Sequence, residues 1–188
     1  VLANRRVYPG QTVSFELPPE GEGVAPQPEI PVNVVYEDAF AVVLEKPPHL
    51  AVHPTLNYPY DTLANGYAAW AAQQGISPVF RPVNRIDKDT SGLVLAAKNR
   101  PALRALNEII RQDMLQKEYL CITAGRPPEG VHEAYLRHFE KNNKVHVQSL
   151  AAPGYKKIIT QVQVLKTCGP YSLCRIGLIT GRTHQIRA

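Results

Sequence analysis

The sequence is poor in cysteine, with only Cys121, Cys168 and Cys174 among its 188 residues. An odd number of cysteines without a Cys-x-x-Cys spacing is not a disulfide framework, and it fits a reducing compartment. No apolar run reaches the length that crosses a bilayer, and the N-terminus lacks the apolar stretch of a signal peptide. The sequence therefore predicts a soluble, cytoplasmic protein, and it argues against secreted disulfide scaffolds and membrane proteins.

Spacings typical of metal ligands are also scarce. His49 and His53 are four residues apart, which would suit a metal site on a helix. Pro47, Pro48 and Pro54 argue against a helix in this stretch, because proline interrupts the helical hydrogen bonds. We therefore expect no metal site.

The charge is moderately one-sided. Lys and Arg number 21 against 16 Asp and Glu, which gives a net charge of +5 and a pI of about 9.2. Such a surplus permits binding to a phosphate backbone, although ordinary solvated lysines produce the same figure. With 44% hydrophobic and 20% charged residues, the chain can bury a core and is not disordered throughout.

Composition divides the chain into three parts. Residues 1–19 suggest a turn at Pro9-Gly10 followed by a short alternating strand that reaches Phe15. Residues 20–31 are dense in Pro and Gly and predict a semi-stiff linker. Residues 32–188 then form the globular domain.

Hydrophobic patterning in this domain predicts several strands and two helices. The predicted strands are residues 32–36, 40–44, 93–97, 118–124, 158–165 and 173–179. Asp61 is expected to cap the first helix and Gly75 to end it. Asn99 is expected to cap the second, with Pro101 in its first turn. Few helices between many strands predict an α+β fold with a mixed or mostly antiparallel sheet and flanking helices.

The most informative segment is the polar run Asn84-Arg85-Ile86-Asp87-Lys88-Asp89-Thr90-Ser91-Gly92, directly before the predicted strand at 93–97. Loops on a rigid scaffold commonly carry reactive groups. Taken alone, Asp87 could simply close a turn by bonding its own backbone, and Asp89 is expected to do so. Lys88 is expected to be solvated.

Four places in the chain resemble motifs of the RluA-type RNA pseudouridine synthases. They are the stretch from Glu45 to Pro54, the polar run 84–92, Gln116-Lys117-Glu118-Tyr119, and Thr180-Gly181-Arg182-Thr183-His184-Gln185-Ile186-Arg187. Two long motifs in the expected order make a chance match improbable. On these residues the chain is identified as a member of that family.

The resemblance implies the pseudouridine synthase catalytic fold and the conversion of uridine to pseudouridine within RNA. It implies that Asp87 acts near C1′ and C2′ of the ribose, that Arg187 pairs with Asp87, and that Tyr119 stacks on the flipped base. Physical chemistry agrees with the pairing, since burial alone would raise the pKa of a carboxyl group and a fixed cation opposes this. No step requires a cofactor or a metal.

Further RNA contacts are expected at Arg85, Ile186, Arg182, Lys46 and His53. The resemblance implies that Arg85 helps to hold the opened RNA and that Ile186 forms an apolar wall of the pocket. The arginines of the late motif could instead bind phosphate, because a loop that leads into a helix suits anions.

Some residues differ from the family motifs, and others are expected to have only structural roles or to be solvated. Asn84 stands where the family usually has His, and it cannot titrate. His49 stands where the family often has Gly, which predicts a different turn. His184 is expected to be a structural hydrogen-bonding residue. The Lys141–Lys144 and Lys156-Lys157 patches remain either solvated faces or RNA contacts.

The resemblance also concerns the two ends of the chain. It implies that residues 1–19 are the tail of an S4-like RNA-binding domain, and that a helix beginning near Thr183 continues beyond Ala188. We therefore expect a catalytic domain that is incomplete at its C-terminus, so that residues 1–188 alone bind RNA weakly and turn over poorly.

The expected partner is RNA, ribosomal in preference to transfer RNA because of the S4-like remnant, with no membrane and no obligate protein partner. Two other functions stay open. One is a catalytically silent RNA-binding module of the same fold. The other is a hydrolase that uses Asp87, which would require a second carboxylate.

Overall fold

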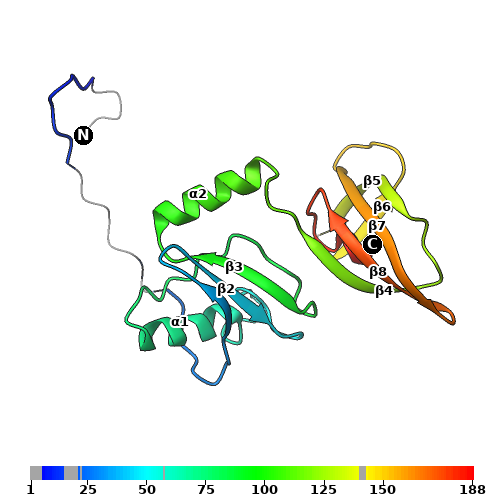
Figure 1. Cartoon of the computed structure of the whole chain (residues 1–188), viewed down its shortest axis with the longest axis horizontal. Coiled ribbons are helices and arrows are strands. Elements are labelled where there is room, and N and C mark those ends of the chain that lie inside the picture. The colour runs from blue at the N-terminus through cyan, green and yellow to red at the C-terminus, as the bar shows by residue number, and fades with distance from the viewer. Residues whose placement is uncertain (1–5, 15–20, 22, 57, 140–142) are drawn as a thin grey trace.

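The computed structural model describes residues 6–14, 21, 23–56, 58–139 and 143–188, and its strands form two antiparallel sheets (Figure 1). The first sheet has the order β1-β2-β3, and the second has the order β4-β8-β7-β5-β6. The strands are β1 (Asn33–Glu37), β2 (Ala41–Lys46), β3 (Gly92–Ala97), β4 (Glu118–Ala124), β5 (Gly130–Phe139), β6 (Lys144–Gln148), β7 (Lys156–Cys168) and β8 (Tyr171–Leu178). The predicted α+β class is confirmed.

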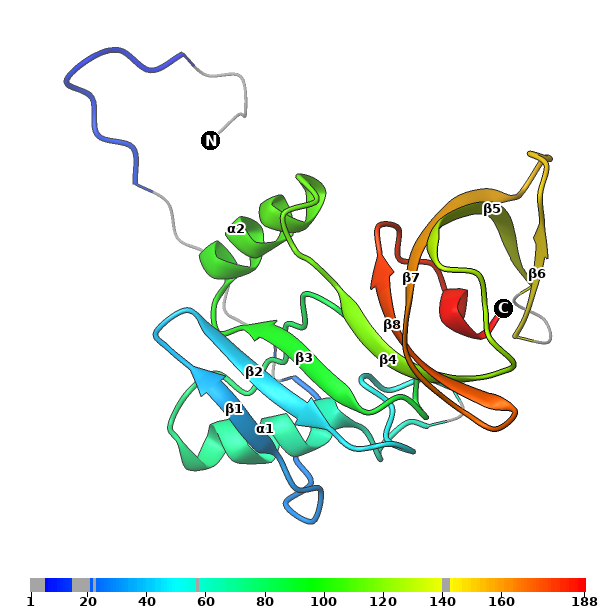
Figure 2. The ribbon, with the colours of Figure 1, turned by 45° about the vertical axis from the view of Figure 1, so that its right-hand side comes forward.

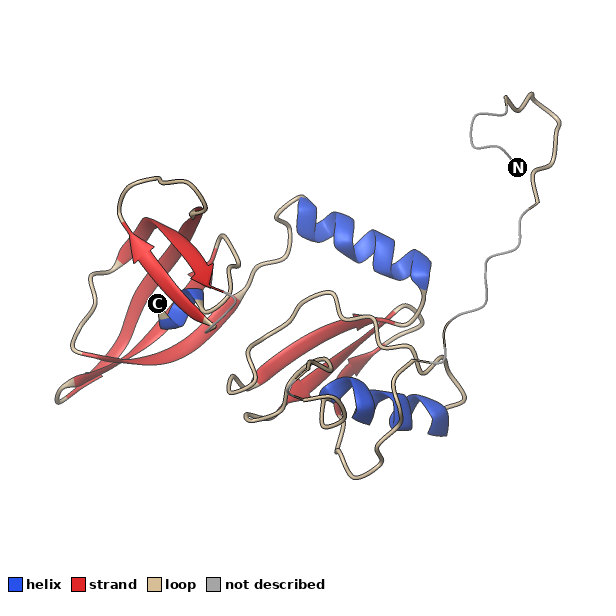
Figure 3. Ribbon diagram, turned by 180° about the vertical axis from the view of Figure 1, so that it is seen from behind, coloured by secondary structure: helices blue, strands red, loops and turns tan. Residues whose placement is uncertain are grey.

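Helix α1 (Leu63–Gln73) lies against one face of the first sheet (Figure 3). Leu63 and Tyr67 are fully buried, and they pack in one core with Leu44 of β2 and Val94 of β3. The N-cap residue is Thr62, so the prediction that Asp61 caps the helix is wrong by one position. This core holds β2 and β3 together, and the ends of those strands carry the candidate site.

Helix α2 (Arg100–Arg111) runs beside β3 (Figure 3). Its predicted cap is confirmed, because the side chain of Asn99 accepts a hydrogen bond of 2.9 Å from the backbone N–H of Ala102. Pro101 occupies the first turn, where no intrahelical partner is lost. The chain then passes from α2 to β4, the first strand of the second sheet.

Part of the predicted linker packs against α1. The side chain of Asn65 donates a hydrogen bond of 2.8 Å to the carbonyl of Ala25. A Cβ atom on Gly66 would lie only 2.9 Å from the carbonyl oxygen of Ile30, so helix and segment approach as closely as their backbones allow. The packed unit therefore begins near Gly23, earlier than predicted.

The N-terminal tail forms the expected turn but not the expected strand. Gln11 N donates to Tyr8 O at 3.2 Å across Pro9-Gly10. The residues that follow, up to Ser14, belong to no strand, and Phe15 lies outside the described residues. A strand needs a partner, and no strand pairs with the described part of this tail.

The chain after β8 ends in a short 3-10 helix, η1 (Gln185–Arg187), where a longer helix from Thr183 was expected. It lies within the curve of the second sheet (Figure 2). His184, directly before it, has a φ of 58°, a left-handed conformation that interrupts a regular helix. None of the described helices is long and apolar enough to cross a membrane.

Candidate active site

The segment of residues 84–92, hereafter the Asp87 loop, is anchored to the strand that follows it. The Asn84 side chain accepts a hydrogen bond of 2.8 Å from Leu95 N and donates one of 3.1 Å to Leu93 O. The turn itself is closed by the backbone, with Thr90 N donating to Asp87 O at 3.0 Å. An amide side chain serves here because the position requires one acceptor and one donor and no titration.

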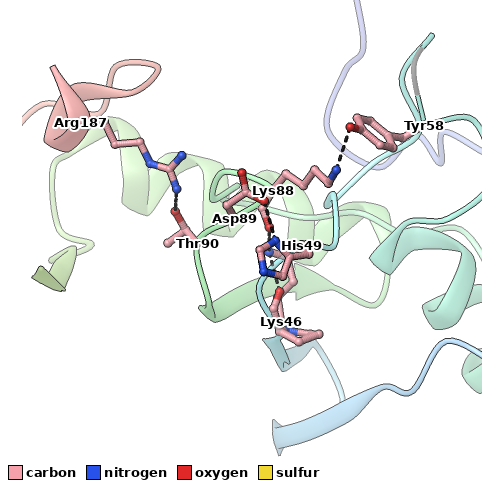
Figure 4. A network of polar contacts seen from close by, with 8 residues as sticks. Lys46, His49, Tyr58, Lys88, Asp89, Thr90 and Arg187 are labelled. Carbon is pink, nitrogen blue, oxygen red and sulfur yellow. Dashed lines mark hydrogen bonds and ion pairs between the residues drawn. The ribbon is translucent and has the colours of Figure 1, made fainter.

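Lys46 lies beneath the Asp87 loop (Figure 4). Its side chain is completely buried, and Nζ donates to Pro47 O at 2.8 Å and to Lys88 O at 2.9 Å. Burial lowers the pKa of Lys46, while the charges of Asp89 and Asp87 oppose this effect. The expectation that Lys46 contacts RNA is therefore corrected, because its ammonium supports the loop from inside.

His49 and Asp89 form an exposed pair that joins the two segments. His49 Nδ1 lies 3.0 Å from Asp89 Oδ1, and this hydrogen bond holds the pKa of Asp89 below its usual range. The backbone of His49 has a φ of 65°, the left-handed region where glycine is most stable. A histidine in place of glycine thus requires no different turn. Asp89, expected to bond its own backbone, contacts His49.

Asp87 and Arg187 are in contact although Asp87 precedes β3 of the first sheet and Arg187 follows β8 of the second. Arg187 Nε lies 3.6 Å from Asp87 Oδ2. Arg187 Nη2 also donates a hydrogen bond of 3.1 Å to Thr90 Oγ1, which Figure 4 shows. The Asp87 side chain is one-third exposed and the Arg187 side chain nearly half. A partly solvated pair of this kind adds little stability, so its value lies in fixing the geometry of the carboxylate.

His184 is a second neighbour of the Asp87 carboxylate. Its Nε2 lies 4.0 Å from Asp87 Oδ2, and only 21% of its side chain is exposed. Its ring and the ring of His138 are nearly perpendicular, with the ring centroids 6.0 Å apart. Sequence reasoning assigned His184 only a structural role. Its spacing from Arg187 was the available signal, because residues three apart lie on the same side of a 3-10 turn.

Tyr119 on β4 is half-buried between the two sheets. It packs against the core of the first sheet, and it pairs in register with Ile176 of β8 in the second. Burial raises the pKa of Tyr119, and the negative charge of Asp87 raises it further. Its hydroxyl therefore stays protonated at neutral pH, and it lies close enough to Asp87 for the two groups to interact electrostatically.

Gln185 holds the late motif against β7, a role that the sequence analysis missed. Its Oε1 accepts hydrogen bonds from Arg182 N at 3.0 Å and from Thr180 Oγ1 at 3.1 Å. Its Nε2 donates to Thr160 Oγ1 at 2.8 Å and to Ile159 O at 3.2 Å. The side chain is buried and all of these contacts are internal. Gln185 thus fixes the turn that delivers Arg187.

The other predicted RNA contacts lie at or near the surface. Arg85 is exposed, and its charge adds to burial in lowering the pKa of His53. The His53 ring lies 5.5 Å from the ring of Phe80. Arg182 is exposed and Ile186 is half-buried. The structure thus brings Arg85 and His53 together, and it leaves Arg182 with an outward position.

The basic residues outside the motifs differ in their surroundings. Lys88, expected to be solvated, donates a hydrogen bond of 2.8 Å to the hydroxyl of Tyr58. Lys157 Nζ lies 2.8 Å from Glu133 Oε2, and this carboxylate raises the pKa of Lys157. In the other basic patch, Lys141 lies outside the described residues. Among the residues that the structure describes, no group of three or more His, Cys, Asp or Glu is placed to hold a metal ion.

Comparison with protein families decides the relationship. The family described as RNA pseudouridylate synthase matches residues 41–188, which include all four motifs. This chain belongs to the RNA pseudouridylate synthase family. The match contains the Asp87 loop, Tyr119 and the late motif, so the predicted resemblance to RluA-type synthases is confirmed.

Curated members of the pseudouridylate synthase family are similar along the whole chain. Ribosomal large subunit pseudouridine synthase D of Haemophilus ducreyi is 31% identical over 192 residues, covering 100% of this chain and 58% of that protein. The uncharacterised RNA pseudouridine synthase YlyB of Bacillus subtilis is 34% identical over 194 residues, covering 100% of this chain and 62% of that protein. The chain thus spans about three-fifths of the length of these two relatives.

Solved structures of the family share the fold. Human RNA Pseudouridylate Synthase Domain Containing 4 superposes with a TM-score of 0.67 at 23% identity, covering 82% of this chain and 61% of that one. Human RNA Pseudouridylate Synthase Domain Containing 1 gives a TM-score of 0.63 at 20% identity, covering 91% and 66%. At these identities the likeness establishes the fold.

Proposed function

We propose that the protein isomerises uridine to pseudouridine in RNA, with Asp87 as the catalytic carboxylate. The observation that carries this proposal is the contact between Asp87 and Arg187, which two separate sheets bring together beside Tyr119. A reaction at the ribose requires an ionised carboxylate that a fixed cation orients without neutralising it. The family membership supports the same chemistry.

The proposed reaction is an isomerisation, so the product has the same elemental composition as uridine. The bond from C1′ to N1 breaks, the uracil turns, and C1′ bonds to C5; N1 gains a proton and C5 loses one. Asp87 acts on the C1′/C2′ side of the ribose, where charge develops as the glycosidic bond breaks. Arg187 holds the carboxylate in place through its contacts with Asp87 and Thr90.

The target base must leave the stack to reach Asp87, at a cost of about a few kcal/mol. Tyr119 offers an aromatic face for the flipped uracil, and its raised pKa keeps the phenol neutral at physiological pH. A neutral phenol supports stacking and hydrogen-bond donation, and it disfavours a role as a base at C5. Arg85, exposed at the start of the Asp87 loop, is placed to contact the opened strand.

Ribosomal RNA is the substrate that we propose. The support is the name of the relative from Haemophilus ducreyi, a ribosomal large subunit pseudouridine synthase. The moderate excess of positive charge is compatible with any RNA, so it does not distinguish ribosomal from transfer RNA.

Tritium release tests the proposal. The protein is incubated with ribosomal RNA transcripts that carry tritium at uracil C5, and release into water is compared with that of Asp87→Asn, which keeps the shape of the side chain and removes its charge. We expect release by the wild type and a loss of at least a thousandfold in the variant.

Three outcomes are distinguished in this assay. Release that Asp87→Asn abolishes supports the synthase. Free uracil in the products would identify a hydrolase. Tight RNA binding without either product would identify a silent binding module and would contradict the proposal.

A further inference from the structure

A tight turn next to the Asp87 loop presents apolar and aromatic side chains to solvent. Thr55 N donates to Tyr58 O at 3.0 Å, and Tyr58 N donates to Thr55 O at 3.1 Å, so two backbone hydrogen bonds join these residues. Leu56 at its tip is completely exposed, Tyr58 is 40% exposed, and Tyr60 just beyond it is 61% exposed. Exposed aromatic residues that lie close together commonly mark a binding surface.

The turn is tied to the Asp87 loop through Lys88, the residue that follows Asp87. Lys88 Nζ donates to the Tyr58 hydroxyl at 2.8 Å and lies 4.0 Å from the centroid of the Tyr58 ring. Figure 4 shows Tyr58 and Arg187 on opposite sides of Asp89. A ring that is already ordered loses less conformational entropy when a ligand binds.

The chemistry of this surface fits unpaired nucleotides. Every base has a π-face that stacks on an exposed tyrosine without regard to sequence. The ammonium of Lys88 has three donors, of which the Tyr58 hydroxyl takes one, so it can also contact a phosphate. The neighbouring Asp87 carboxylate is paired with the Arg187 guanidinium, so it repels a phosphate chain less.

We propose that Tyr58, Tyr60 and Lys88 form a nucleotide-binding subsite for the unpaired RNA strand that flanks the target uridine, on the side of the Asp87 loop away from Arg187. The two tyrosines stack on bases, and Lys88 holds both the Tyr58 ring and the adjoining phosphate. The assignment of the flanking strand rests on the proposed function, because it takes Asp87 as the position of the target.

Binding to two probes tests the subsite. One probe is a fluorescein-labelled 12-mer of oligouridylate, and the other has the same length and backbone but lacks the bases. Fluorescence anisotropy is measured with wild type, Tyr58→Ala, Tyr60→Ala and Lys88→Gln. The matched control is Tyr171→Ala, which removes a tyrosine of similar exposure (56%) from β8.

Stacking predicts a specific pattern. Each tyrosine variant should bind the oligouridylate about tenfold more weakly and the abasic probe as wild type does. Lys88→Gln should weaken both probes and reduce the salt dependence by about one phosphate contact. Tyr58→Phe, which keeps the ring, should retain most of the affinity for the oligouridylate.

The inference is overturned if wild type binds the oligouridylate no better than the abasic probe, or if the tyrosine variants match Tyr171→Ala. Unfolding midpoints of all variants exclude a loss of fold as the cause. Tritium release separates this result from the proposed function. Wild type that forms pseudouridine while the tyrosine variants keep its apparent KM refutes the subsite alone, and absent release refutes the function and the flanking assignment.

Discussion

Arg187 makes two contacts that a simpler cation could not make together. Its Nε faces the Asp87 carboxylate while Nη2 bonds the Thr90 hydroxyl. Both contacts follow from the planar guanidinium, whose donors point in fixed directions. The three donors of a lysine ammonium sit on one nitrogen, so they cannot reach acceptors that face two different nitrogens of the guanidinium without a shift of the side chain.

Arg187→Lys is therefore expected to lower the single-turnover rate of pseudouridine formation by at least tenfold. The free energy of unfolding should change by no more than about 0.5 kcal/mol, because the pair is solvated. Tritium release and urea denaturation measure the two quantities. Arg175→Lys, at an exposed position on β8, is the matched control, and an equal rate in both variants would contradict the role of the planar group.

The pair of His49 and Asp89 predicts a measurable titration. The hydrogen bond from His49 lowers the pKa of Asp89 below its ordinary value of 3.8. The contribution of this carboxylate to stability is therefore fully present above pH 3.8 and is lost as the pH falls through the lower, folded-state value.

His49→Gly removes the imidazole and retains a residue suited to positive φ, so the Asp89 midpoint should rise toward 3.8. Carboxyl NMR chemical shifts measure this midpoint. Asp38 is the internal control, because the backbone amides of Phe40 and Ala41 lower its pKa independently of His49. An unchanged Asp89 midpoint would show that a group other than His49 lowers the pKa of Asp89.

Strands β5 and β6 show the limit of prediction at the level of elements. Runs of β-branched residues identified β4, β7 and β8, but β5 includes charged residues and histidines such as Glu133, Arg137 and His138. It is a strand because it pairs with β7 on one side and β6 on the other. Pairing between distant segments is a tertiary property that local composition does not record.

The candidate site divides along the same line. Asp87, Arg187 and Tyr119 could be predicted because the chemistry requires their side chains at recognisable positions in motifs. Lys46 was expected to contact RNA, and the role of Gln185 was not predicted. Both roles depend on burial of the side chain beneath the loop that it supports. Lys46 is buried beneath a loop that is more than forty positions later in the chain, and Gln185 packs on a strand about twenty-five positions earlier, so local sequence does not reveal either contact.

Gln185→Leu tests the supporting role of the late motif. The leucine leaves several internal hydrogen-bonding groups around position 185 without partners, and the free energy of unfolding should fall by about 1–3 kcal/mol. Urea denaturation measures this loss, and tritium release should fall with it because Arg187 is no longer held. Gln163→Leu, exposed on β7, is the control and should be nearly neutral.

Across the whole molecule, the packed unit extends back to the segment before β1. Contacts of Ala25 and Ile30 with α1 make this segment part of the first core's outer layer. A high content of Pro and Gly predicted a linker, but proline also suits an extended segment that packs on a helix without donating backbone hydrogen bonds. Composition alone cannot separate these two uses.

Gly66→Ala measures how tightly this segment is packed. Alanine in place of glycine within a helix normally stabilises by about 1 kcal/mol. Here the new Cβ would lie 2.9 Å from Ile30 O, which is backbone, so we expect a loss of about 1–3 kcal/mol instead. Asn107→Ala, exposed on α2, is the control for helix propensity. Stabilisation by Gly66→Ala would contradict tight packing, because it would mean that the segment around Ile30 moves away to make room for the methyl group.

Because Asp87 precedes the second sheet in the chain and Arg187 follows it, the two residues of the ion pair are synthesised at different times. The first sheet and α1 come from one continuous stretch that ends at Ala97, whereas Arg187 follows Asp87 by a hundred positions. During synthesis at about 5–20 residues per second, Asp87 leaves the ribosome roughly 5–20 s before its cation. The nascent chain therefore carries the Asp87 carboxylate without Arg187 until translation has delivered the second sheet.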